Sequence, residues 1–596
     1  MPTFFNNILY SRYAFWIGFA AGVLFWWLYG KLRDRYPAIK EKIRERIQIT
    51  RQGLLAGTEA RYRGDVLRKA QRMHLAAPLF SLDEILEPVG VITQLPSEPE
   101  ENGQAGNDQE TLKLPYLPDW PEFGAAFHWP VLALSQALEG GANLILLGNP
   151  GSGKTVALAS LASQLAAHDA KAGTLSDYLP LLVHVADLSL SLQEAARDPF
   201  DVLLETISTQ VSALTLPRLN VVIRNALESG KALLLMDGLD EFPPDPIDLA
   251  VDYLTILIKK YPKLRLIVAA SPSYYDGLAA LGFAPVAVSA WNSRNKSHFT
   301  HHWGELWDRY IVQGLPENAG RIDSLLLNGW LSGGDMPGTP LELTLRTWAA
   351  YAGDSPGAGT RDSIEAYISR MTAGIPKARP VLEKIASVML LNANPVITVQ
   401  EAEKSIAEAW QSYPAPDNPL PEETSEDTTG GKAVEPNQAG TSPVSRYAVS
   451  RALPDLVDRG LLVERKGSHI SFLHPVMNGY LASSALSQVE LPAQLHGQPQ
   501  WAGKQQTMQY LASCKDISNV LSALVEGQDD PLQRNLLLAS RWLQEAPKAA
   551  RWRSSVMRQA AMLIQNETLS LGLRARLLTS LVLSNDPGVP ILMRQL

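Results

Sequence analysis

Short apolar runs alternate with longer helical patterns through the middle of the chain. The runs lie at 142–147, 179–187 and 264–270, and a fourth, within 231–242, ends in Asp237. Unbroken apolar runs of this length are typical of strands that are buried on both faces of a parallel sheet. Three helical patterns fall between the runs, at 156–167, 201–214 and 219–229. The alternation predicts an α/β fold with a parallel sheet.

The C-terminal part of the chain shows helical patterns only. They cover 517–525, 532–543, 552–564 and 571–583 and are separated by short breaks. We predict a C-terminal α-solenoid of HEAT-like helical repeats over 490–596, although no clean period of ~40 residues emerges. A plain helical packing domain is the open alternative. In the solenoid interpretation, these helices would receive a protein or ligand trigger.

The N-terminal end carries one long apolar segment. Tyr13 to Gly30 has no charged residue and ends in Trp-Trp-Leu-Tyr-Gly without a small-x-small cleavage site, which disfavours a signal peptide. As a helix it would be roughly 27 Å long, enough to span a bilayer. Seven Lys and Arg residues follow it within 31–46, whereas Arg12 alone precedes it. We therefore predict a single-pass transmembrane anchor over 1–36, in the cell membrane, with the bulk of the chain cytosolic.

Three segments near the anchor and further along are predicted to connect folded parts. Residues 37–93 have a helical pattern, with Ile39, Ile43 and Ile47 forming a stripe beside basic residues. This juxtamembrane helical segment would lie on lipid headgroups or form a solvated stalk, and both interpretations stay open. Residues 94–113 and 412–445 are rich in Pro, Gly and acidic residues, which predicts a disordered linker and a disordered insert.

Composition narrows the partners and the compartment. The 596 residues carry a net charge of −8, and the pI is about 5.8, which disfavours a chain-wide nucleic-acid surface. Cys514 is the single cysteine, so the chain forms no internal disulfide. A reducing, cytosolic setting agrees with the predicted orientation. The length accommodates several domains, since ~100–200 residues is the usual domain size.

One motif indicates the chemistry. Residues 148–155 read G-x-x-x-x-G-K-[ST], between a predicted buried strand and a predicted helix, which is the phosphate-binding P-loop in its expected context. The predicted ATP- and ADP-binding residues are Gly148, Asn149, Pro150, Gly151, Ser152, Gly153, Lys154 and Thr155. Backbone N–H groups and the helix N-terminus would hold phosphate oxygens, Lys154 would reach the β- and γ-phosphates, and Thr155 would bind Mg²⁺.

An acidic group at the end of a second strand completes the predicted metal site. Asp237 ends a buried parallel strand, so its carboxylate should emerge at the same sheet edge as the P-loop and bind Mg²⁺ with Thr155. Asp240 and Glu241 follow directly. Either could act as the general base that holds the attacking water; we favour Glu241, although the sequence barely separates them.

The P-loop and Asp237-Gly238-Leu239-Asp240-Glu241 together resemble the NACHT branch of the STAND signalling ATPases. The second motif of that family has a small residue after the Mg²⁺ acid, then a hydrophobic residue and two acids. The resemblance covers about 114–485. It implies a NACHT P-loop nucleotide-binding domain at 114–290, a helical domain at 291–355 and a winged-helix domain at 356–485.

The resemblance also implies roles for residues further along. An arginine follows the strand at 264–270 in the family and senses the γ-phosphate, but Ser271 stands there in this chain. Either efficient hydrolysis is in doubt or another arginine substitutes. Pro340 matches a proline that packs near adenine, with a plain helix-start proline as the alternative. His474 matches a histidine that contacts the β-phosphate of ADP, with a packed helix-start histidine as the alternative. The strands of the wing would be 461–465 and 469–473, and no nucleic-acid partner is expected.

The leading functional hypothesis is a membrane-anchored signalling switch in defence or signal transduction. ADP would keep it closed, and ATP would open it and favour a homo-oligomer; its ATPase activity would be slow. Two alternatives remain. One is an AAA+-like ATP-driven remodelling motor at the membrane, with steady turnover. The other is a scaffold that binds nucleotide only for its stability.

Overall fold

The computed structural model describes residues 19, 57–93, 130–188, 197–271, 276–312, 339–354, 360–412, 443–492, 494–521, 533–543, 546–584 and 586–595. The chain divides into two compact units. One consists of residues 1–62 with 212–222, in which Arg61 Nη1 donates to the Leu214 carbonyl at 3.1 Å. The other consists of residues 63–211 with 223–596 and contains every feature of the site described below.

The larger unit is built on a seven-stranded sheet with the order β2-β1-β7-β3-β6-β5-β4. Five of its strands run parallel, and their buried side chains are almost entirely apolar. They are β3 (Leu144–Leu147), β4 (Leu179–His184), β5 (Ala232–Asp237), β6 (Arg265–Ala270) and β7 (Ala284–Val288). The predicted parallel sheet of a P-loop fold is therefore confirmed.

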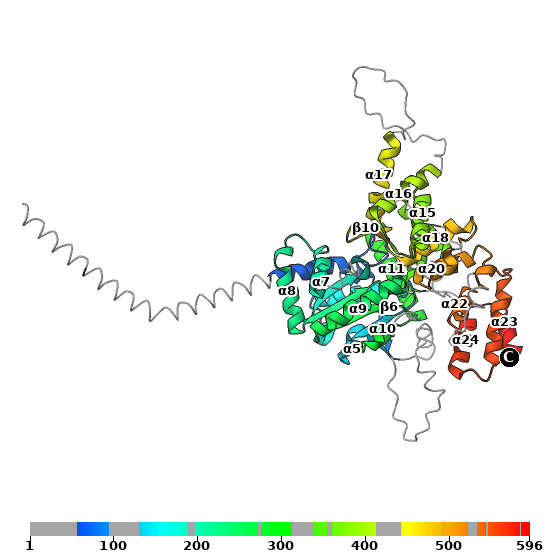
Figure 1. The fold of residues 1–596 in the computed structure, drawn as a ribbon, viewed down its shortest axis with the longest axis horizontal. Helices are drawn as coiled ribbons and strands as arrows, with labels where there is room; N and C mark the ends of the chain where they lie inside the picture. Colours follow the sequence, from blue (N-terminus) through cyan, green and yellow to red (C-terminus); the bar gives the residue numbers. More distant parts are fainter. Residues whose placement is uncertain are drawn as a thin grey trace, which may run out of the picture. The chain divides into compact units, whose positions relative to one another are not determined.

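Helices connect these strands (Figure 1). Three of them overlap the predicted helical patterns, but α7 ends at Ser208 and not at 214. Among them, α6 packs against β4 and β5, and α7 packs against β4 and α9. The helices of this region are α5 (Leu134–Glu139), α6 (Lys154–Ala166), α7 (Pro199–Ser208), α8 (Leu216–Ser229), α9 (Pro244–Lys260), α10 (Asp276–Ala280) and α11 (Ser293–Tyr310).

The prediction of a continuous helical segment over 37–93 is wrong at its C-terminal end. A helix covers 57–70 and a short helix, α2, covers Leu82–Ile85, but Gly90–Thr93 form strand β1. This strand pairs antiparallel with β7 on one side and with β2 (Val131–Ala133) on the other. Val91 and Ile92 are fully buried there. Gly-Val-Ile-Thr favours a strand, because glycine is a poor helix former and β-branched residues fit a sheet. The sheet therefore begins before the predicted domain boundary at 114.

A second, three-stranded antiparallel sheet follows later in the chain, with the order β8-β10-β9. Its hairpin joins β9 (Leu462–Arg465) to β10 (His469–Phe472), which confirms the predicted pair of strands. Gly467 and Ser468 both have positive φ in the turn, at 75° and 57°. The other elements of this region are α15 (Ala378–Leu391), β8 (Val396–Thr398), α16 (Val399–Ser412), α17 (Pro443–Asp458) and α18 (Pro475–Ser487).

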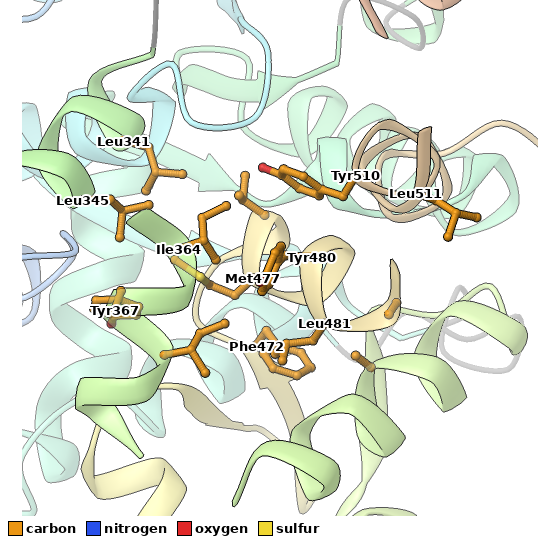
Figure 2. Close-up of a cluster of buried hydrophobic side chains, with 14 of the residues drawn as sticks. Leu341, Leu345, Ile364, Tyr367, Phe472, Met477, Tyr480, Leu481, Tyr510 and Leu511 are labelled. Atoms are coloured by element: carbon orange, nitrogen blue, oxygen red, sulfur yellow. The ribbon is translucent and has the colours of Figure 1, made fainter. Parts of the chain in front are cut away.

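One apolar core joins this second sheet to the helices around it. Figure 2 shows side chains from α13 (Pro340–Tyr351), α14 (Thr360–Met371), β10, α18 and α20 (Ala502–Ala512) packed together. Tyr480 of α18 and Tyr510 of α20 meet edge to face, with ring centroids 5.7 Å apart. Because α13 begins at Pro340 and α18 begins directly after His474, this core fixes the positions of both predicted site residues.

The C-terminal region is helical, as predicted. It contains α19 (Gln494–Gly497), α22 (Arg534–Trp542), α23 (Trp552–Gln565), α24 (Leu571–Leu583) and α25 (Val589–Gln595), and α24 packs against both α22 and α23. The buried Arg553 guanidinium forms an ion pair with Asp586 and donates to the Leu543 and Ala546 carbonyls, each at 2.6 Å. Whether these helices repeat in the HEAT manner stays a prediction.

Several predicted features fall outside the described residues. They are the apolar segment 13–30 apart from Phe19, the linker 94–113, and residues 413–442 of the predicted insert. Within the part of the chain that the structure describes, no helix is long and apolar enough to cross a membrane.

Candidate nucleotide-binding site

The P-loop connects β3 to α6 in the geometry that phosphate binding requires. Gly151 and Gly153 have φ of +84° and +100°, which residues with a side chain rarely adopt. This conformation turns the loop around the N-terminus of α6, which begins at Lys154. The N-terminus of a helix is a natural anion site, because free N–H groups and the helix dipole both favour negative charge.

Lys154 is held across the loop. Its side chain is 6 % exposed, and its ammonium donates to the Gly148 carbonyl at 2.7 Å and to the Asn149 carbonyl at 3.3 Å. It also forms an ion pair with Asp240 Oδ2 at 3.0 Å. The predicted lysine therefore lies on the P-loop beside one of the predicted acids.

The predicted metal residues lie together. The Thr155 hydroxyl hydrogen-bonds to the Asp237 carboxylate. Burial raises the pKa of Asp237, the negative charges of Asp240 and Glu241 raise it further, and His184 opposes them. A divalent cation here would offset the cost of burying this negative charge, so the donors fit Mg²⁺. The described residues contain no group of three or more His, Cys, Asp and Glu side chains that could hold a metal ion by themselves.

Gly238 explains why a small residue follows Asp237. Its φ is +82°, and a Cβ built on it would lie 2.3 Å from His184 Nε2. His184 is the last residue of β4 and stands opposite Asp237 in the parallel register. The second motif therefore needs glycine for both its backbone conformation and the space that the imidazole occupies.

His184 is a site residue that the sequence did not identify. Its Nδ1 accepts the Ala186 N–H at 3.1 Å, so in the neutral ring Nε2 carries the proton. Nε2 lies 3.7 Å from Glu241 Oε1. Burial opposes ionisation of Glu241, but His184, Arg465 and His474 together hold the pKa of this carboxyl below its usual range. Its sequence signal is a single histidine within the apolar run 179–187.

The two predicted catalytic acids have different surroundings. Asp240 is paired with Lys154, whereas Glu241 faces His184. A carboxylate paired with the P-loop lysine is less available to a water molecule than one that faces an imidazole. This difference favours Glu241, and its role as general base stays a prediction.

Pro340 lies beside the P-loop. The Leu341 N–H donates to the Gly151 carbonyl at 3.2 Å, and a Cβ on Gly151 would lie 2.9 Å from Thr339 Oγ1. Pro340 and Leu341 line the same cavity as Lys154 and Thr155. The start of α13 is thus a wall of the nucleotide cavity, as expected if Pro340 packs near the base.

His474 lines the same cavity from the N-terminus of α18. Its Nδ1 accepts the Val476 N–H at 3.3 Å, which leaves an N–H at Nε2 in the neutral ring. Burial lowers the pKa of His474 to about 4, and the charges of Glu241, Lys154 and Asp240 also act on it. At neutral pH it therefore offers one uncharged N–H donor near the P-loop lysine.

Arg465, at the end of β9, is a second residue that the sequence did not identify. Its Nη2 lies 3.3 Å from His184 Nε2, its Nη1 lies 3.6 Å from Asp187 Oδ2, and its Nε donates to Ser471 Oγ at 2.8 Å. It too lines the cavity. Nothing in the local pattern of the predicted hairpin distinguishes it from other basic residues.

The remaining wall comes from the segment that was predicted to be juxtamembrane. Lys69 and apolar residues between Met73 and Val89 line the cavity, together with Trp291 and Phe299. Lys69 donates to Gln210 Oε1 at 2.7 Å, and burial lowers its pKa to about 8. The apolar part of this wall suits a flat nucleobase. The sequence pattern did not indicate this wall, because residues 37–93 were predicted to lie outside the nucleotide domain.

Fold and cavity together define the class: a P-loop NTPase with a mostly parallel sheet. Residues 142–305 match the family described as NACHT domain. The chain thus contains a NACHT-type NTPase domain, and the resemblance seen in its motifs is confirmed.

Two solved structures show a low similarity to this chain. The structure of Drosophila ORC bound to DNA is 14 % identical and has a TM-score of 0.23, with 68 % of this chain and 97 % of that chain covered. Cdc6p from Pyrobaculum aerophilum is 15 % identical with a TM-score of 0.21, covering 64 % and 99 %. TM-scores this low carry no argument about function. No curated protein matches the chain in sequence.

Proposed function

We propose that the protein is a nucleotide-controlled signalling switch, anchored in the cell membrane by its N-terminal segment, with the bulk of the chain in the cytosol. The observation that carries this proposal is that a single cavity is lined by the P-loop and, from the other side, by Arg465 and His474. A ligand between these walls contacts both the parallel-sheet domain and the later β8-β10-β9 region. Its phosphates can therefore control whether the two regions stay together.

The residues of the cavity have separable tasks in this proposal. The P-loop amides and Lys154 bind the diphosphate, and Thr155 and Asp237 hold Mg²⁺, which neutralises phosphate charge. Pro340 and the apolar wall between Met73 and Val89 pack against the base. The Nε2–H of His474 donates to a β-phosphate oxygen and stabilises the closed form with ADP bound.

The later region acts as a winged helix used for packing. The support is its element order, α15-β8-α16-α17-β9-β10, and its small antiparallel sheet with a terminal hairpin. In the ATP-bound form this region would separate, and open subunits would associate in the membrane. The helices in 490–596 would receive the trigger.

The two forms must differ in affinity for the two nucleotides. A nearly complete change of population needs a difference of about 10⁴-fold. Slow hydrolysis, with Glu241 or Asp240 positioning the water, would return the protein to the ADP state. A slow ATPase is expected because Ser271, which cannot neutralise phosphate charge, follows β6.

The test uses the full-length protein in detergent. We expect ADP to co-purify with it, and cross-linking to give larger assemblies with a non-hydrolysable ATP analogue than with ADP. Identical assemblies in the two nucleotides would contradict the switch. Rapid steady turnover that is lost in Glu241→Gln would instead favour a motor. His474→Gln should weaken ADP binding about tenfold, the effect of one hydrogen bond to a charged group.

A further inference from the structure

The end of β6 provides no cation for the cavity. Ser271 follows this strand, and it is not among the described residues that line the cavity with the P-loop. A terminal phosphate nevertheless brings additional negative charge into a site that already holds Asp237, Asp240 and Glu241. Among the basic side chains of the described cavity lining, Lys154 is paired with Asp240 and Lys69 donates to Gln210, which leaves Arg465 as the further cation beside Mg²⁺.

Arg465 lies where such a cation is needed. Its side chain is only 11 % exposed, and it reaches the cavity from the β9–β10 hairpin to meet His184 at the end of β4. His184 in turn lies opposite Asp237 in the sheet and 3.7 Å from Glu241. The guanidinium therefore lies on the acid side of the cavity, close to the residues that are expected to position the metal and the attacking water.

The contact between Arg465 and His184 brings two donors together. Since His184 Nδ1 accepts from Ala186, its Nε2 carries a proton, and a guanidinium has donors only. The two groups lie 3.3 Å apart in the cavity. Glu241, Asp187 and Ser471 already face these donors, and a phosphate oxygen that enters the cavity would compete with them for the guanidinium.

We propose that Arg465 is the terminal-phosphate sensor of this site and that the β9–β10 hairpin supplies it in place of the end of β6. The inference rests on the proposed function, since it assumes that a nucleotide occupies the cavity. Arginine suits this role because its planar fork binds phosphate through two parallel hydrogen bonds.

Asp187 is a second binding partner for the Arg465 guanidinium, as an alternative to the phosphate. It lies 3.6 Å from Arg465 Nη1 and accepts the backbone N–H of Lys466 at 3.2 Å, so it holds the start of the hairpin turn. A terminal phosphate competes with Asp187 for the guanidinium. Binding of ATP therefore weakens the attachment of the hairpin, whereas ADP, which lacks that phosphate, leaves it in place.

The experiment measures binding rather than turnover. Dissociation constants for ADP and for a non-hydrolysable ATP analogue are compared by calorimetry in the full-length protein. We expect Arg465→Met to lower the preference for the ATP analogue about 10- to 100-fold while ADP affinity changes less than about threefold. Asp187→Asn should have the opposite effect and raise the preference for the ATP analogue, because the terminal phosphate then has no carboxylate competing with it for the guanidinium. Arg459→Met, at an exposed arginine before β9, is the matched control.

Hydrogen exchange supplies a second readout. In the wild type, the ATP analogue should lower the protection of amides in β9 and β10 relative to ADP, and Arg465→Met should remove that difference. Arg465→Lys keeps the charge but loses the fork, so it should recover only part of the preference. If Arg465→Met does not fold, Arg465→Lys and Asp187→Asn still carry the test.

The outcomes separate this inference from the proposed function. Equal loss of ADP and ATP-analogue affinity in Arg465→Met would overturn the sensor, because it would show that the arginine only attaches the hairpin. An unchanged preference in both Arg465→Met and Asp187→Asn would also overturn it. If the wild type binds neither nucleotide, and Lys154→Ala behaves like the wild type, the proposed function itself fails.

Discussion

The two walls of the cavity are built in different ways. The P-loop wall is a run of eight consecutive residues, 148–155, from the end of β3 to the first two residues of α6, fixed by positive-φ glycines and by the parallel sheet. The opposite wall brings Arg465 and His474 from a separate sheet and core, about 300 residues later. The P-loop wall is suited to bind the phosphates that ADP and ATP have in common. The opposite wall is suited to distinguish ATP from ADP by the additional phosphate.

The forces that hold the walls differ as well. The strands of the P-loop wall are continuous and buried on both faces, so this wall separates only if the domain unfolds. Ion pairs attach the hairpin wall: Arg465 with Asp187, and Lys466 with Glu205, whose side chain is 45 % exposed. The exposed pair contributes little, about 0–1 kcal/mol. The Arg465–Asp187 pair is only 11 % exposed on both side chains, so its separation needs a new partner for the guanidinium, such as a phosphate.

The largest expected effect is on the P-loop wall. Lys154→Ala should weaken binding of both ADP and an ATP analogue by about 100- to 1000-fold, since it removes the main cation for the phosphates. Calorimetry on the full-length protein measures this loss. Lys171→Ala, at an exposed lysine away from the cavity, is the control. Wild-type affinity in Lys154→Ala would mean that nucleotide does not bind at the P-loop.

Gly238 tests how closely the strand ends pack. Gly238→Ala should lower the free energy of unfolding by about 2–4 kcal/mol, from backbone strain plus the clash with His184. Gly282→Ala is a matched control, because Gly282 has the same φ of +82° and no atom within 4 Å of a built Cβ. Its cost should be about 1–2 kcal/mol, from strain alone. Equal costs in the two variants, measured by urea unfolding, would show that His184 moves aside easily.

His474 should make the stability of the folded protein depend on pH. Burial lowers its pKa to about 4 in the folded protein from the ordinary 6.5, so between these values the unfolded chain binds a proton that the folded protein does not. Stability from this group is complete above pH 6.5 and falls as the pH decreases towards 4, by about 1–3 kcal/mol.

The measurement compares urea unfolding of the wild type and His474→Gln at several pH values. The stability of the wild type relative to the variant should decrease from pH 7 to pH 4.5. His301→Gln controls for replacing an imidazole by an amide on the exposed face of α11. A difference that does not change with pH would mean that His474 can be protonated without leaving its place in the cavity.

The smallest expected effect concerns the attachment of the hairpin. Glu205→Gln removes the ion pair with Lys466, which joins Nζ and Oε1 at 3.0 Å. It should cost less than about 1 kcal/mol in stability and slightly increase hydrogen exchange in β9 and β10. Glu464→Gln, at an exposed position on β9, is the control. A loss of several kcal/mol would show that the hairpin wall is as firmly held as the P-loop wall.

Much of the fold could be predicted from the sequence because its signals are local. The parallel strands are continuous apolar runs, and the P-loop and the acids after β5 are contiguous motifs. The hairpin turn at Lys466–Ser468 could also be found, from a glycine between two short strands. Strand β1 was missed although Gly-Val-Ile-Thr has β propensity, because four residues give a weak local signal and their place in the sheet depends on pairing with β7 and β2.

What the sequence by itself determined is the chemistry of one wall: a phosphate loop, a metal site and the acids beside it, since consecutive residues and backbone conformation define these. The family resemblance also pointed to His474, but the tertiary structure alone decided that His184, Arg465 and the segment between Met73 and Val89 face that loop. Their place depends on strand register, on pairing at the sheet edge and on a core shared by α13, α18 and α20. These contacts join residues that are far apart in the chain, and no local pattern encodes them.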